Sequence, residues 1–391
     1  MEISILFWVL SASLLYLLAT SVILIRNRFE LTELPYDTDE TFNSKKISVC
    51  IPARNEELNI GSLLKTVLNQ KYDNFEVHVL DDQSTDTTPA ILREFKQQHP
   101  QKLFIHKGKE KPDDWFGKPW ACQQLSEIAT GELLLFIDAD TKLEPEALTR
   151  INYSFQYYGL DMLTVWPRQI LGTFWENTAL PLIYFALLTI LPSIYVYRKP
   201  RWMPASIYHQ LRENFAAANG QCVAFTKDAY HQISGHRSVK QQVVEDVELA
   251  KNIKREGLTL RMFTGMNTIS CRMYRNEKEM FEGLRKNFLA GFSNSLPLFI
   301  TAAILHIIVF ILPFFTLLWQ VFNYNPPVFF LSIASITLIF IQRLVISTWF
   351  SWNPLYVFLH PIGVIWFQRL GIVKIVDKIT GKTALWKGRA V

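Results

Sequence analysis

Two uninterrupted apolar runs dominate the pattern of hydrophobic and polar positions along the chain. Residues 3–25 contain no charged side chain, and a helix of this length covers the ~30 Å hydrocarbon core of a bilayer at about 1.5 Å rise per residue. Residues 287–368 contain one charged side chain, that of Arg343. Both runs predict membrane-spanning helices. We expect Arg343 either to be buried with a functional role or to snorkel near a helix end.

The second run divides at the turn-like residues 323–327, which read Asn-Tyr-Asn-Pro-Pro. We therefore expect one span over residues 297–321 and another over residues 327–350. Residues 355–370 are also apolar, but this segment is short and has His360-Pro361 near its middle.

Basic residues indicate how the chain is oriented. Arg26 and Arg28 follow the first run while only Glu2 precedes it, which disfavours a cleaved signal peptide and places the N-terminus outside and residue 26 onward inside the cell. Residues 369–391 carry six basic residues and one acidic residue, which accounts for the whole net charge of +5. A cytoplasmic tail requires only two later crossings, so we expect residues 355–370 to be re-entrant or interfacial.

The region between the two runs alternates between strand and helix patterns. Buried strands are predicted at residues 47–52, 75–80 and 133–137. Residues 55–69 have the apolar spacing of an amphipathic helix. A further helix runs towards Gln98, and we expect Ser84 or Thr85 to cap it. This order predicts an α/β fold with parallel strands.

Acidic residues come directly after the predicted strands. Asp81 and Asp82 follow the second strand, and Asp138 and Asp140 follow the third. Ligands of parallel α/β sheets bind at the carboxyl ends of the strands, so these acids form a candidate site. Two carboxylates separated by one residue can share Mg²⁺ or Mn²⁺ with a phosphate-bearing ligand.

Composition narrows the class of protein. Hydrophobic residues make up 49% of the 391 residues and charged residues 19%, and there are 4 cysteines. These values exclude a disordered chain, a collagen-like fibre and a disulfide-framed miniprotein. Because the net positive charge lies entirely in the tail, the middle region offers no basic stripe for nucleic acid.

Short motifs in this region resemble those of the family 2 glycosyltransferases. Four occur in the family's order: Pro-Ala-Arg-Asn-Glu-Glu at 52–57, Leu-Asp-Asp-Gln-Ser-Thr-Asp-Thr-Thr at 80–88, Asp138-Ala139-Asp140, and Glu245-Asp246. Trp-Phe-Gly-Lys-Pro-Trp-Ala at 115–121 and Trp-Lys-Gly-Arg at 386–389 resemble the membrane-bound branch, which glycosylates carotenoids (diaponeurosporenoate type) and hopanoids. The resemblance covers essentially the whole chain. It implies a GT-A type, Rossmann-like nucleotide-sugar-binding domain joined to transmembrane helices.

The resemblance also implies roles for individual residues toward a UDP-sugar donor. The loop 52–57 and Asp82 would hold the uracil and ribose, Asp138 the ribose or metal, and Asp140 the Mg²⁺ or Mn²⁺ that bridges the diphosphate. Lys118 would stabilise the leaving diphosphate, the alternative being an ordinary surface lysine. The expected nucleotide-sugar-binding residues are Pro52, Arg54, Asn55, Glu56, Asp81, Asp82, Lys118, Asp138 and Arg285.

An inverting transfer needs a base that takes the proton of the acceptor. By resemblance Asp246 is this base and Glu245 is its positioning neighbour; the alternative is that both acids only begin a helix. Residues 219–222 and 235–237 are similar to the family's acceptor-side loops, where His236 either touches substrate or is structural.

One family element is missing. Processive polysaccharide synthases and several lipid glycosyltransferases carry Gln-x-x-Arg-Trp after the base. No such sequence occurs in this chain, which weakens the interpretation as a polymerase. The comparable region is residues 282–288, where Arg285 and Lys286 are candidates to assist the diphosphate.

An apolar insert lies between the metal motif and the base. Residues 180–197 contain no charged side chain and are interrupted by Pro181 and Pro192. A single crossing would put the Asp140 and Asp246 motifs on opposite sides of the bilayer, so we expect an interfacial helix or a membrane-dipping hairpin; the alternative is a buried core helix.

These observations together predict four parts of the chain. They are an N-terminal transmembrane helix (1–28), a cytoplasmic catalytic domain (29–286) with a membrane-associated insert (172–204), C-terminal transmembrane or re-entrant helices (287–370), and a basic cytoplasmic tail (371–391). The expected protein is a multi-pass enzyme of the cytoplasmic membrane that moves one hexose, most simply glucose, from a UDP-sugar to a polyisoprenoid lipid such as a carotenoid. The alternatives are a hopanoid, sphingolipid or diacylglycerol acceptor, or a non-catalytic transporter or sensor that binds nucleotide-sugar.

Overall fold

The computed structural model describes residues 2–35, 42–292, 295–382, 385–386 and 389–390, which form two compact units. The sheet unit comprises Leu31–Ile170 and Ser193–Met273. The helical unit comprises the described residues of Met1–Glu30, Leu171–Pro192 and Tyr274–Val391. The boundary at Pro192/Ser193 therefore passes through the predicted insert 172–204 and assigns its two parts to different units.

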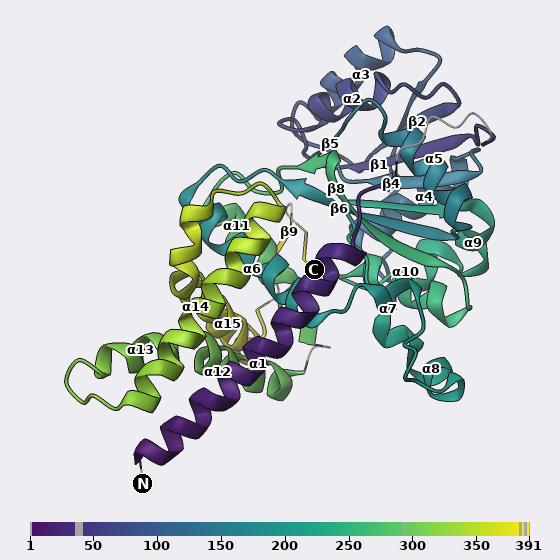
Figure 1. The fold of residues 1–391 in the computed structure, drawn as a ribbon. Helices are drawn as coiled ribbons and strands as arrows, with labels where there is room; N and C mark the ends of the chain where they lie inside the picture. Colours follow the sequence, from purple (N-terminus) through teal and green to yellow (C-terminus); the bar gives the residue numbers. More distant parts are fainter. Residues whose placement is uncertain (1, 36–41, 293–294, 383–384, 387–388, 391) are drawn as a thin grey trace. The chain divides into compact units, whose positions relative to one another are not determined.

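The sheet unit is built on one mixed sheet with the strand order β3-β2-β1-β4-β7-β6-β8-β5 (Figure 1). The strands are β1 (Ile47–Ala53), β2 (Phe75–Asp81), β3 (Leu103–Lys107), β4 (Leu133–Ile137), β5 (Thr141–Leu143), β6 (Met162–Gln169), β7 (Cys222–Thr226) and β8 (Leu260–Cys271). Strands β3, β2, β1 and β4 run parallel, and β7 is antiparallel to both β4 and β6. The three predicted strands and their parallel pairing are confirmed, whereas β3, β5, β6, β7 and β8 were not predicted.

Helices connect these strands as expected for an α/β fold. They are α2 (Ile60–Leu68), α3 (Thr88–Gln98), α4 (Gly117–Ile128), α5 (Ala147–Tyr158), α7 (Ile194–Tyr197), α8 (Ala205–Leu211), α9 (Lys227–Gln232) and α10 (Glu245–Arg255), with 3₁₀ turns at Arg212–Phe215 and Gly235–Val239. Helix α2 buries its apolar face, including Leu63, Leu64 and Val67, in the main core of the sheet unit. It begins at Ile60 and not at Asn55, because residues 54–57 are held in a loop described below.

The predicted cap of the next helix is wrong. Helix α3 begins at Thr88, and its first backbone N–H group is bonded to Asp86 Oδ1 at 2.9 Å. Ser84 and Thr85 lie before this start and instead bond to Asn55 in the preceding loop. Ser84 and Thr85 of the polar run 81–88 therefore hydrogen-bond to the loop that follows β1, and Asp86 bonds to the start of the helix.

The helical unit contains the long apolar helices. Its helices are α1 (Glu2–Glu30), α6 (Phe174–Ile190), α11 (Glu277–Asn287), α12 (Leu296–Phe310), α13 (Leu312–Trp319), α14 (Pro326–Trp349) and α15 (His360–Thr380), with 3₁₀ turns at Ala290–Phe292 and Pro354–Leu359 and a short hairpin of β9 (Leu385–Trp386) and β10 (Arg389–Ala390). Four helical segments of the described chain are long and apolar enough to cross a membrane: Ile5–Glu30, Leu296–Trp319, Pro326–Trp349 and Pro354–Thr380.

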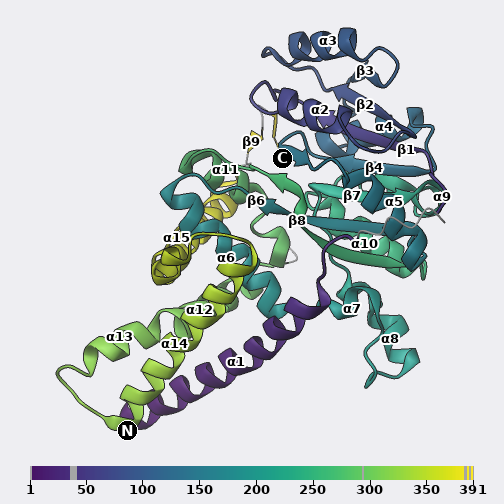
Figure 2. The same cartoon turned by 45° about the horizontal axis from the view of Figure 1, so that its top comes forward.

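Polar side chains hold these apolar helices together, as is common where lipid supplies no hydrophobic drive for association. Helix α1 runs beside α14, as Figure 2 shows, and Gln342 Nε2 donates to the carbonyl of Leu17 at 2.8 Å and to Ser21 Oγ at 2.7 Å. Asn27 Nδ2 of α1 donates to the carbonyls of Leu188 and Leu191 at 2.8 and 2.7 Å, which fixes α6 against α1.

The predicted spans and the predicted short segment 355–370 can be compared with the observed helices. Helices are present where spans were predicted, although α12 and α13 are separated at Ile311, just before Pro313. The last helix continues to Thr380, well beyond residue 370, so the segment is longer than the apolar pattern indicated; its re-entrant topology stays a prediction. Lys387 and Gly388 of the Trp-Lys-Gly-Arg motif lie outside the described residues.

The first part of the predicted insert 172–204 forms helix α6. It is a 17-residue apolar helix with Pro181 inside it, and it packs against α1, α14 and α15 of the helical unit. Leu180, Phe185 and Leu188 are among its buried residues. Its packing is that of a helix within an apolar helical bundle, and its depth in a bilayer stays a prediction.

Candidate active site

Two loops meet at the carboxyl ends of β1 and β2. Arg54 Nη1 donates to the carbonyl oxygen of Asp82 at 2.6 Å, and the backbone N–H of Asn55 donates to Ser84 Oγ at 2.9 Å. The N–H of Asp82 in turn bonds to the carbonyl of Ala53 at 2.8 Å. These bonds join the loop after β1 to the loop after β2, so that two motifs far apart in the sequence form one edge of the site.

Both loops contain a strained residue. Asn55 has a φ of 52° and Gln83 a φ of 58°, in the left-handed region that side chains other than glycine seldom adopt. Such strain costs about 1–3 kcal/mol and persists only where surrounding contacts over-determine it. The bond from the Asn55 N–H to Ser84 Oγ is one of those contacts.

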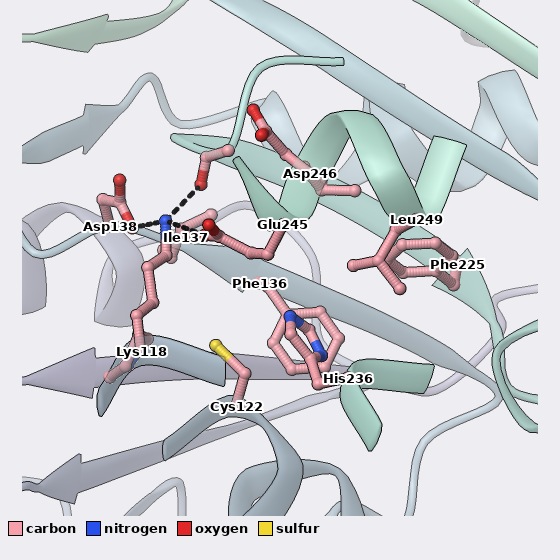
Figure 3. Close-up of a pocket in the computed structure, with 13 residues that line it drawn as sticks. Lys118, Cys122, Phe136, Ile137, Asp138, Phe225, His236, Glu245, Asp246 and Leu249 are labelled. Carbon is pink, nitrogen blue, oxygen red and sulfur yellow. Dashed lines mark hydrogen bonds and ion pairs between the residues drawn. The ribbon is translucent and has the colours of Figure 1, made fainter. Parts of the chain in front are cut away.

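A lysine and two carboxylates meet beyond the end of β4. Lys118, in the first turn of α4, places its Nζ 2.8 Å from Asp138 Oδ1 and 3.0 Å from Glu245 Oε1 (Figure 3). The same ammonium donates to the carbonyl of Gly220 at 3.2 Å. Three acceptors match the three N–H donors of an ammonium group. Lys118 therefore ties β4, α10 and the loop before β7 together.

The charge of this lysine is firmly held. Desolvation alone would lower the pKa of Lys118, but the carboxylates of Asp138 and Glu245 outweigh it and hold this pKa well above its usual value. The side chain as a whole is 36% exposed, while its ammonium is enclosed by the three acceptors. The surface-lysine alternative does not describe a side chain with three such partners.

Asp246 lies next to this cluster, in the first turn of α10. Burial, and then the charge of Glu245, raise the pKa of Asp246 to about 7, although Lys118 and the backbone N–H groups of Val247 and Gly220 favour its ionised form. A methyl group on Gly220 would lie 3.2 Å from both Asp246 Oδ2 and Lys118 Nζ, so a larger residue here would require these two side chains to shift by a few tenths of an ångström. A pKa near neutrality is what a general base needs at physiological pH.

The second carboxylate of the predicted metal motif is that of Asp140. Burial raises the pKa of Asp140 to about 7, with contributions from the charges of Asp138 and Glu56. The Cys271 thiol hydrogen-bonds to its carboxylate, while Oδ1, which is buried, has no hydrogen-bond partner among the residues described. A buried, unpartnered oxygen beside a second carboxylate is the environment that a divalent cation satisfies.

The donor set fits a metal that is shared with a ligand. Across the described ranges, no group of three or more His, Cys, Asp or Glu side chains could hold an ion by itself. Mg²⁺ is commonly bound by one or two carboxylates together with substrate phosphates, and Asp138 and Asp140 match that pattern.

These groups line a pocket whose other wall is apolar. The lining residues are Pro52, Lys118, Cys122, Phe136, Ile137, Asp138, Gly220, Val223, Phe225, His236, Glu245, Asp246 and Leu249. Of these, the apolar wall and Cys122 were not assigned from the sequence. The inward faces of β4 and β7 supply most of that wall, and strand alternation could have indicated it only once the pairing of β4 with β7 was known.

His236 is a buried member of the apolar wall. Its Nδ1 shares a hydrogen bond with the Tyr230 hydroxyl at 2.8 Å, its backbone N–H donates to the same hydroxyl at 3.1 Å, and its ring lies edge-on to Phe136. Burial lowers the pKa of His236 to about 3, so the ring is neutral. These contacts support the structural role while leaving the ring on the pocket surface.

The structure gathers most of the predicted residues at one edge of the sheet. Pro52, Lys118, Asp138, Glu245 and Asp246 line the pocket. Arg54, Asn55, Glu56, Asp81 and Asp82 lie in or at the start of the two joined loops, with Asp81 Oδ1 accepting from the N–H of Ser84 at 3.0 Å.

Arg285 belongs to the helical unit, where it is engaged in ion pairs. Its Nη2 lies 2.6 Å from Asp377 Oδ1, and its Nη1 lies 3.2 Å from Glu282 Oε1. Its predicted role at the diphosphate stays a prediction.

The fold and the carboxylates at the ends of its parallel strands define a GT-A-like α/β domain, accompanied by four long apolar helices. A mannosyltransferase from Pyrobaculum calidifontis, solved with GDP-Man and Mn²⁺, shares this fold with a TM-score of 0.51 at 16% identity, covering 92% of this chain and 99% of that one. Residues 48–234 of the chain match Glycosyl transferase family 2.

Two curated relatives are similar over a larger part of the chain. The 4,4'-diaponeurosporenoate glycosyltransferase of Staphylococcus haemolyticus is 30% identical over 259 residues, which cover 65% of this chain and 64% of the relative. Its counterpart from Staphylococcus aureus is 27% identical over 269 residues, covering 68% and 66%. The chain thus matches slightly less than two thirds of the length of these relatives. The family resemblance of the motifs is confirmed.

Proposed function

We propose that this protein is an inverting glycosyltransferase that moves one hexose, most simply glucose, from a UDP-sugar to the hydroxyl or carboxylate of a polyisoprenoid lipid such as a carotenoid. The observation that carries the proposal is the meeting of Asp138, Lys118, Glu245 and Asp246 around one pocket at the carboxyl edge of the sheet. The relatives' name, diaponeurosporenoate glycosyltransferase, favours the carotenoid acceptor.

The donor is held by the joined loops in this proposal. Arg54, Asn55 and Asp82 form an edge whose polar groups suit the uracil and ribose, and the loops are already fixed to each other before a ligand binds. Pre-formed loops lower the entropic cost of binding the nucleotide. Lys118 lies close enough to the carboxylate cluster to neutralise charge that develops on the leaving diphosphate.

Asp138 and Asp140 would hold Mg²⁺ or Mn²⁺ together with the diphosphate. Bound there, the cation would supply charge neutralisation for the leaving group. The partner-free Oδ1 of Asp140 supports this assignment within the described chain. The mannosyltransferase that shares the fold was solved with Mn²⁺, which is consistent with it.

Asp246 takes the acceptor's proton in the proposed reaction. Its raised pKa keeps it basic enough to accept a proton near pH 7, and its bond from the Gly220 N–H fixes the carboxylate toward the pocket. Glu245 balances Lys118 and thereby positions the start of α10. A carboxylate acceptor arrives ionised and needs no base, in which case Asp246 orients the acceptor instead of deprotonating it.

The helical unit is proposed to embed the enzyme in the cytoplasmic membrane, with the sheet unit on the cytoplasmic side. Its four long apolar helices suit a bilayer, and a carotenoid, hopanoid, sphingolipid or diacylglycerol acceptor would dissolve there. A transporter or sensor that only binds nucleotide-sugar is the remaining alternative, and the base-like environment of Asp246 argues against it.

The test is a transfer assay with purified protein in detergent, host lipid extract, Mg²⁺ or Mn²⁺, and labelled UDP-glucose, UDP-galactose or UDP-N-acetylglucosamine. We expect one donor to give a labelled lipid that mass spectrometry identifies as a lipid carrying one hexose. If no donor labels any lipid while the protein is shown to be folded, the assignment is wrong. If label is incorporated into a long polymer, the single-transfer part of the proposal is wrong.

A further inference from the structure

Arg343 is a charged side chain buried inside the helical unit. It lies on α14, whose buried residues recur every three to four positions as Ser332, Ser335, Ile339, Gln342, Arg343 and Ile346. Its residue exposure is 0%, which excludes the snorkelling alternative for this side chain. None of its three guanidinium nitrogens has a hydrogen-bond partner among the residues described.

An unpaired guanidinium in this position is expensive. Arginine remains charged in proteins, and a buried charge without a partner costs several kcal/mol. Within membrane helices, ionisable residues are rare and mark ligand or ion sites. The guanidinium of Arg343 has no role in the pocket of the sheet unit and no hydrogen bond to a described residue that would stabilise the packing of the helices. We therefore looked for a ligand that could pair with it.

The unit's carboxylates do not supply the missing partner. The sequence has no Asp or Glu between Glu282 and Asp377. Asp377 is paired with Arg285, and the buried Glu176 accepts from Thr173 Oγ1 at 2.7 Å. The counter-ion for Arg343 must come from outside the described chain.

The surroundings of Arg343 combine basic and aromatic groups. His360, at the start of α15, interacts electrostatically with both Arg343 and His306 of α12, and both nitrogens of its fully buried ring lack hydrogen-bond partners within the described residues. The His360 ring lies 5.0 Å from the Phe185 ring and 5.2 Å from the Phe310 ring. Nitrogen donors are thus enclosed by a wall that suits an apolar chain.

We infer that Arg343, together with His306 and His360, forms a binding site in the helical unit for the oxyanion head of a lipid, with Phe185 and Phe310 contacting its apolar chain. A guanidinium pairs with a carboxylate or phosphate through two parallel hydrogen bonds, which suits both chemistries. The oxyanion is either a carboxylate of the lipid acceptor that does not itself receive the sugar or the phosphate of a membrane phospholipid. The acceptor version rests on the proposed function.

The test uses a matched pair of ligands, all-trans-retinoic acid and retinol, which share a polyene chain and differ in the carboxylate. Affinities are measured by quenching of tryptophan fluorescence with the full-length protein in detergent, for wild type, Arg343→Met, Arg343→Lys and His360→Gln. We expect retinoic acid to bind wild type and Arg343→Met to bind it at least about tenfold more weakly, the size of a hydrogen bond to a charged group. Arg343→Lys should recover part of the affinity, and retinol should bind all proteins alike.

Arg26→Met is the control, because Arg26 is an exposed arginine in the same unit, 3.4 Å from Glu30. It should bind retinoic acid as wild type does. Equal affinity of retinoic acid for wild type and Arg343→Met would overturn the inference, as would equal affinity of retinol and retinoic acid for wild type. If Arg343→Met does not fold, Arg343→Lys and His360→Gln replace it. Each should bind retinoic acid more weakly than wild type does, and an affinity equal to that of wild type would overturn the inference.

Native mass spectrometry of protein from phosphatidylglycerol nanodiscs distinguishes the two sources. A phosphatidylglycerol adduct on wild type that is lost in Arg343→Met supports the site with a phospholipid occupant. Retinoic acid that displaces no phospholipid but protects wild type against thermal unfolding supports the acceptor. None of these measurements needs a sugar donor or turnover, so failure of the lipid site leaves the proposed glycosyl transfer standing, and failure of transfer leaves this test valid.

Discussion

The two units treat buried charge in opposite ways. In the sheet unit, Lys118 has three acceptors within 3.2 Å and its charge is balanced by the protein's own carboxylates. In the helical unit, Arg343 is more deeply buried and no described group accepts from it. The charge of Lys118 is already neutralised by neighbouring carboxylates, so a charged ligand could exchange partners with them. The charge of Arg343 has no such partner among the described residues and would be neutralised only by a bound ligand. This difference agrees with the proposals of a catalytic site in the sheet unit and a ligand-binding site in the helical unit.

The largest expected effect is on Asp246 in the sheet unit. Asp246→Asn removes the base and should lower kcat by about 10²–10⁴-fold, the usual contribution of general acid–base catalysis. UDP should bind nearly as tightly as it does to wild type, because the proposed role of this carboxylate is toward the acceptor and not toward the nucleotide. Asp228→Asn, at an exposed acid in the first turn of α9, is the matched control and should be fully active. Steady-state kinetics and UDP calorimetry check both statements, and an unchanged kcat would remove Asp246 from the mechanism.

Removing Lys118 tests whether the balance in the sheet unit matters. Lys118→Met leaves Asp138 and Glu245 facing each other without a cation, so kcat/KM for the donor should fall by roughly 10–100-fold, as for loss of a charge-assisted contact to phosphate. Lys240→Met, which removes the exposed ion pair with Asp114, should change kcat/KM by less than about twofold. Equal losses in the two variants would show that Lys118 has no special role.

Metal binding should depend on the nucleotide. Because no described group of three protein ligands is available, Mn²⁺ should bind weakly alone and at least about tenfold more tightly with UDP present. Asp140→Asn should abolish most of that gain. Electron paramagnetic resonance of free Mn²⁺ measures it, and tight binding of Mn²⁺ without UDP would contradict the shared site.

The pKa of Asp246 predicts how activity depends on pH. With a pKa near 7, the base is ionised only on the alkaline side, so kcat should fall about tenfold per pH unit below that value. A profile that stays flat from pH 5 to 8 would contradict a base with a raised pKa. The profile is measured with a hydroxyl-bearing acceptor, since a carboxylate acceptor needs no base.

The smallest effect concerns stability and has a definite sign. The folded pKa of Asp246 lies above its ordinary value of 3.8, so the folded protein binds more protons and this group's contribution to stability is lost as pH rises through about 7. Asp246→Asn should therefore raise the apparent melting temperature by about 2–4 °C at pH 8, and by less at pH 5. Scanning fluorimetry at the two pH values checks this, and a lower melting temperature at pH 8 would reverse the assigned sign.

The sequence predicted those parts of the site that depend on local order. Asp138 and Asp140 follow a buried strand, and the carboxyl ends of parallel strands lie at one edge of the sheet. The sequence pattern was therefore sufficient to predict that these acids lie at the same edge as the loops after β1 and β2. The apolar wall could not be predicted because it depends on β7 pairing with β4 across more than eighty intervening residues. The Cys271 bond to Asp140 likewise comes from the packing of β8 beside β5.

The limits were similar in the helical unit. Apolar runs located its long helices, because length and hydropathy are local properties. They could not decide whether Arg343 was buried or at the surface, since that depends on which face of α14 meets α1, α6 and α13. The insert had the same ambiguity: its composition suited an interfacial or a core helix, and its contacts with α1 and α15 were visible only in three dimensions.

The measurement that tests the account most directly is the anomeric configuration of the lipid product made from UDP-glucose, whose glucose is α-linked. Proton NMR of the purified product should show one β-linked hexose per lipid, because attack opposite the leaving UDP inverts the anomeric carbon. An α-linked product, or the absence of a hexose-bearing lipid from active, folded protein, would contradict the account.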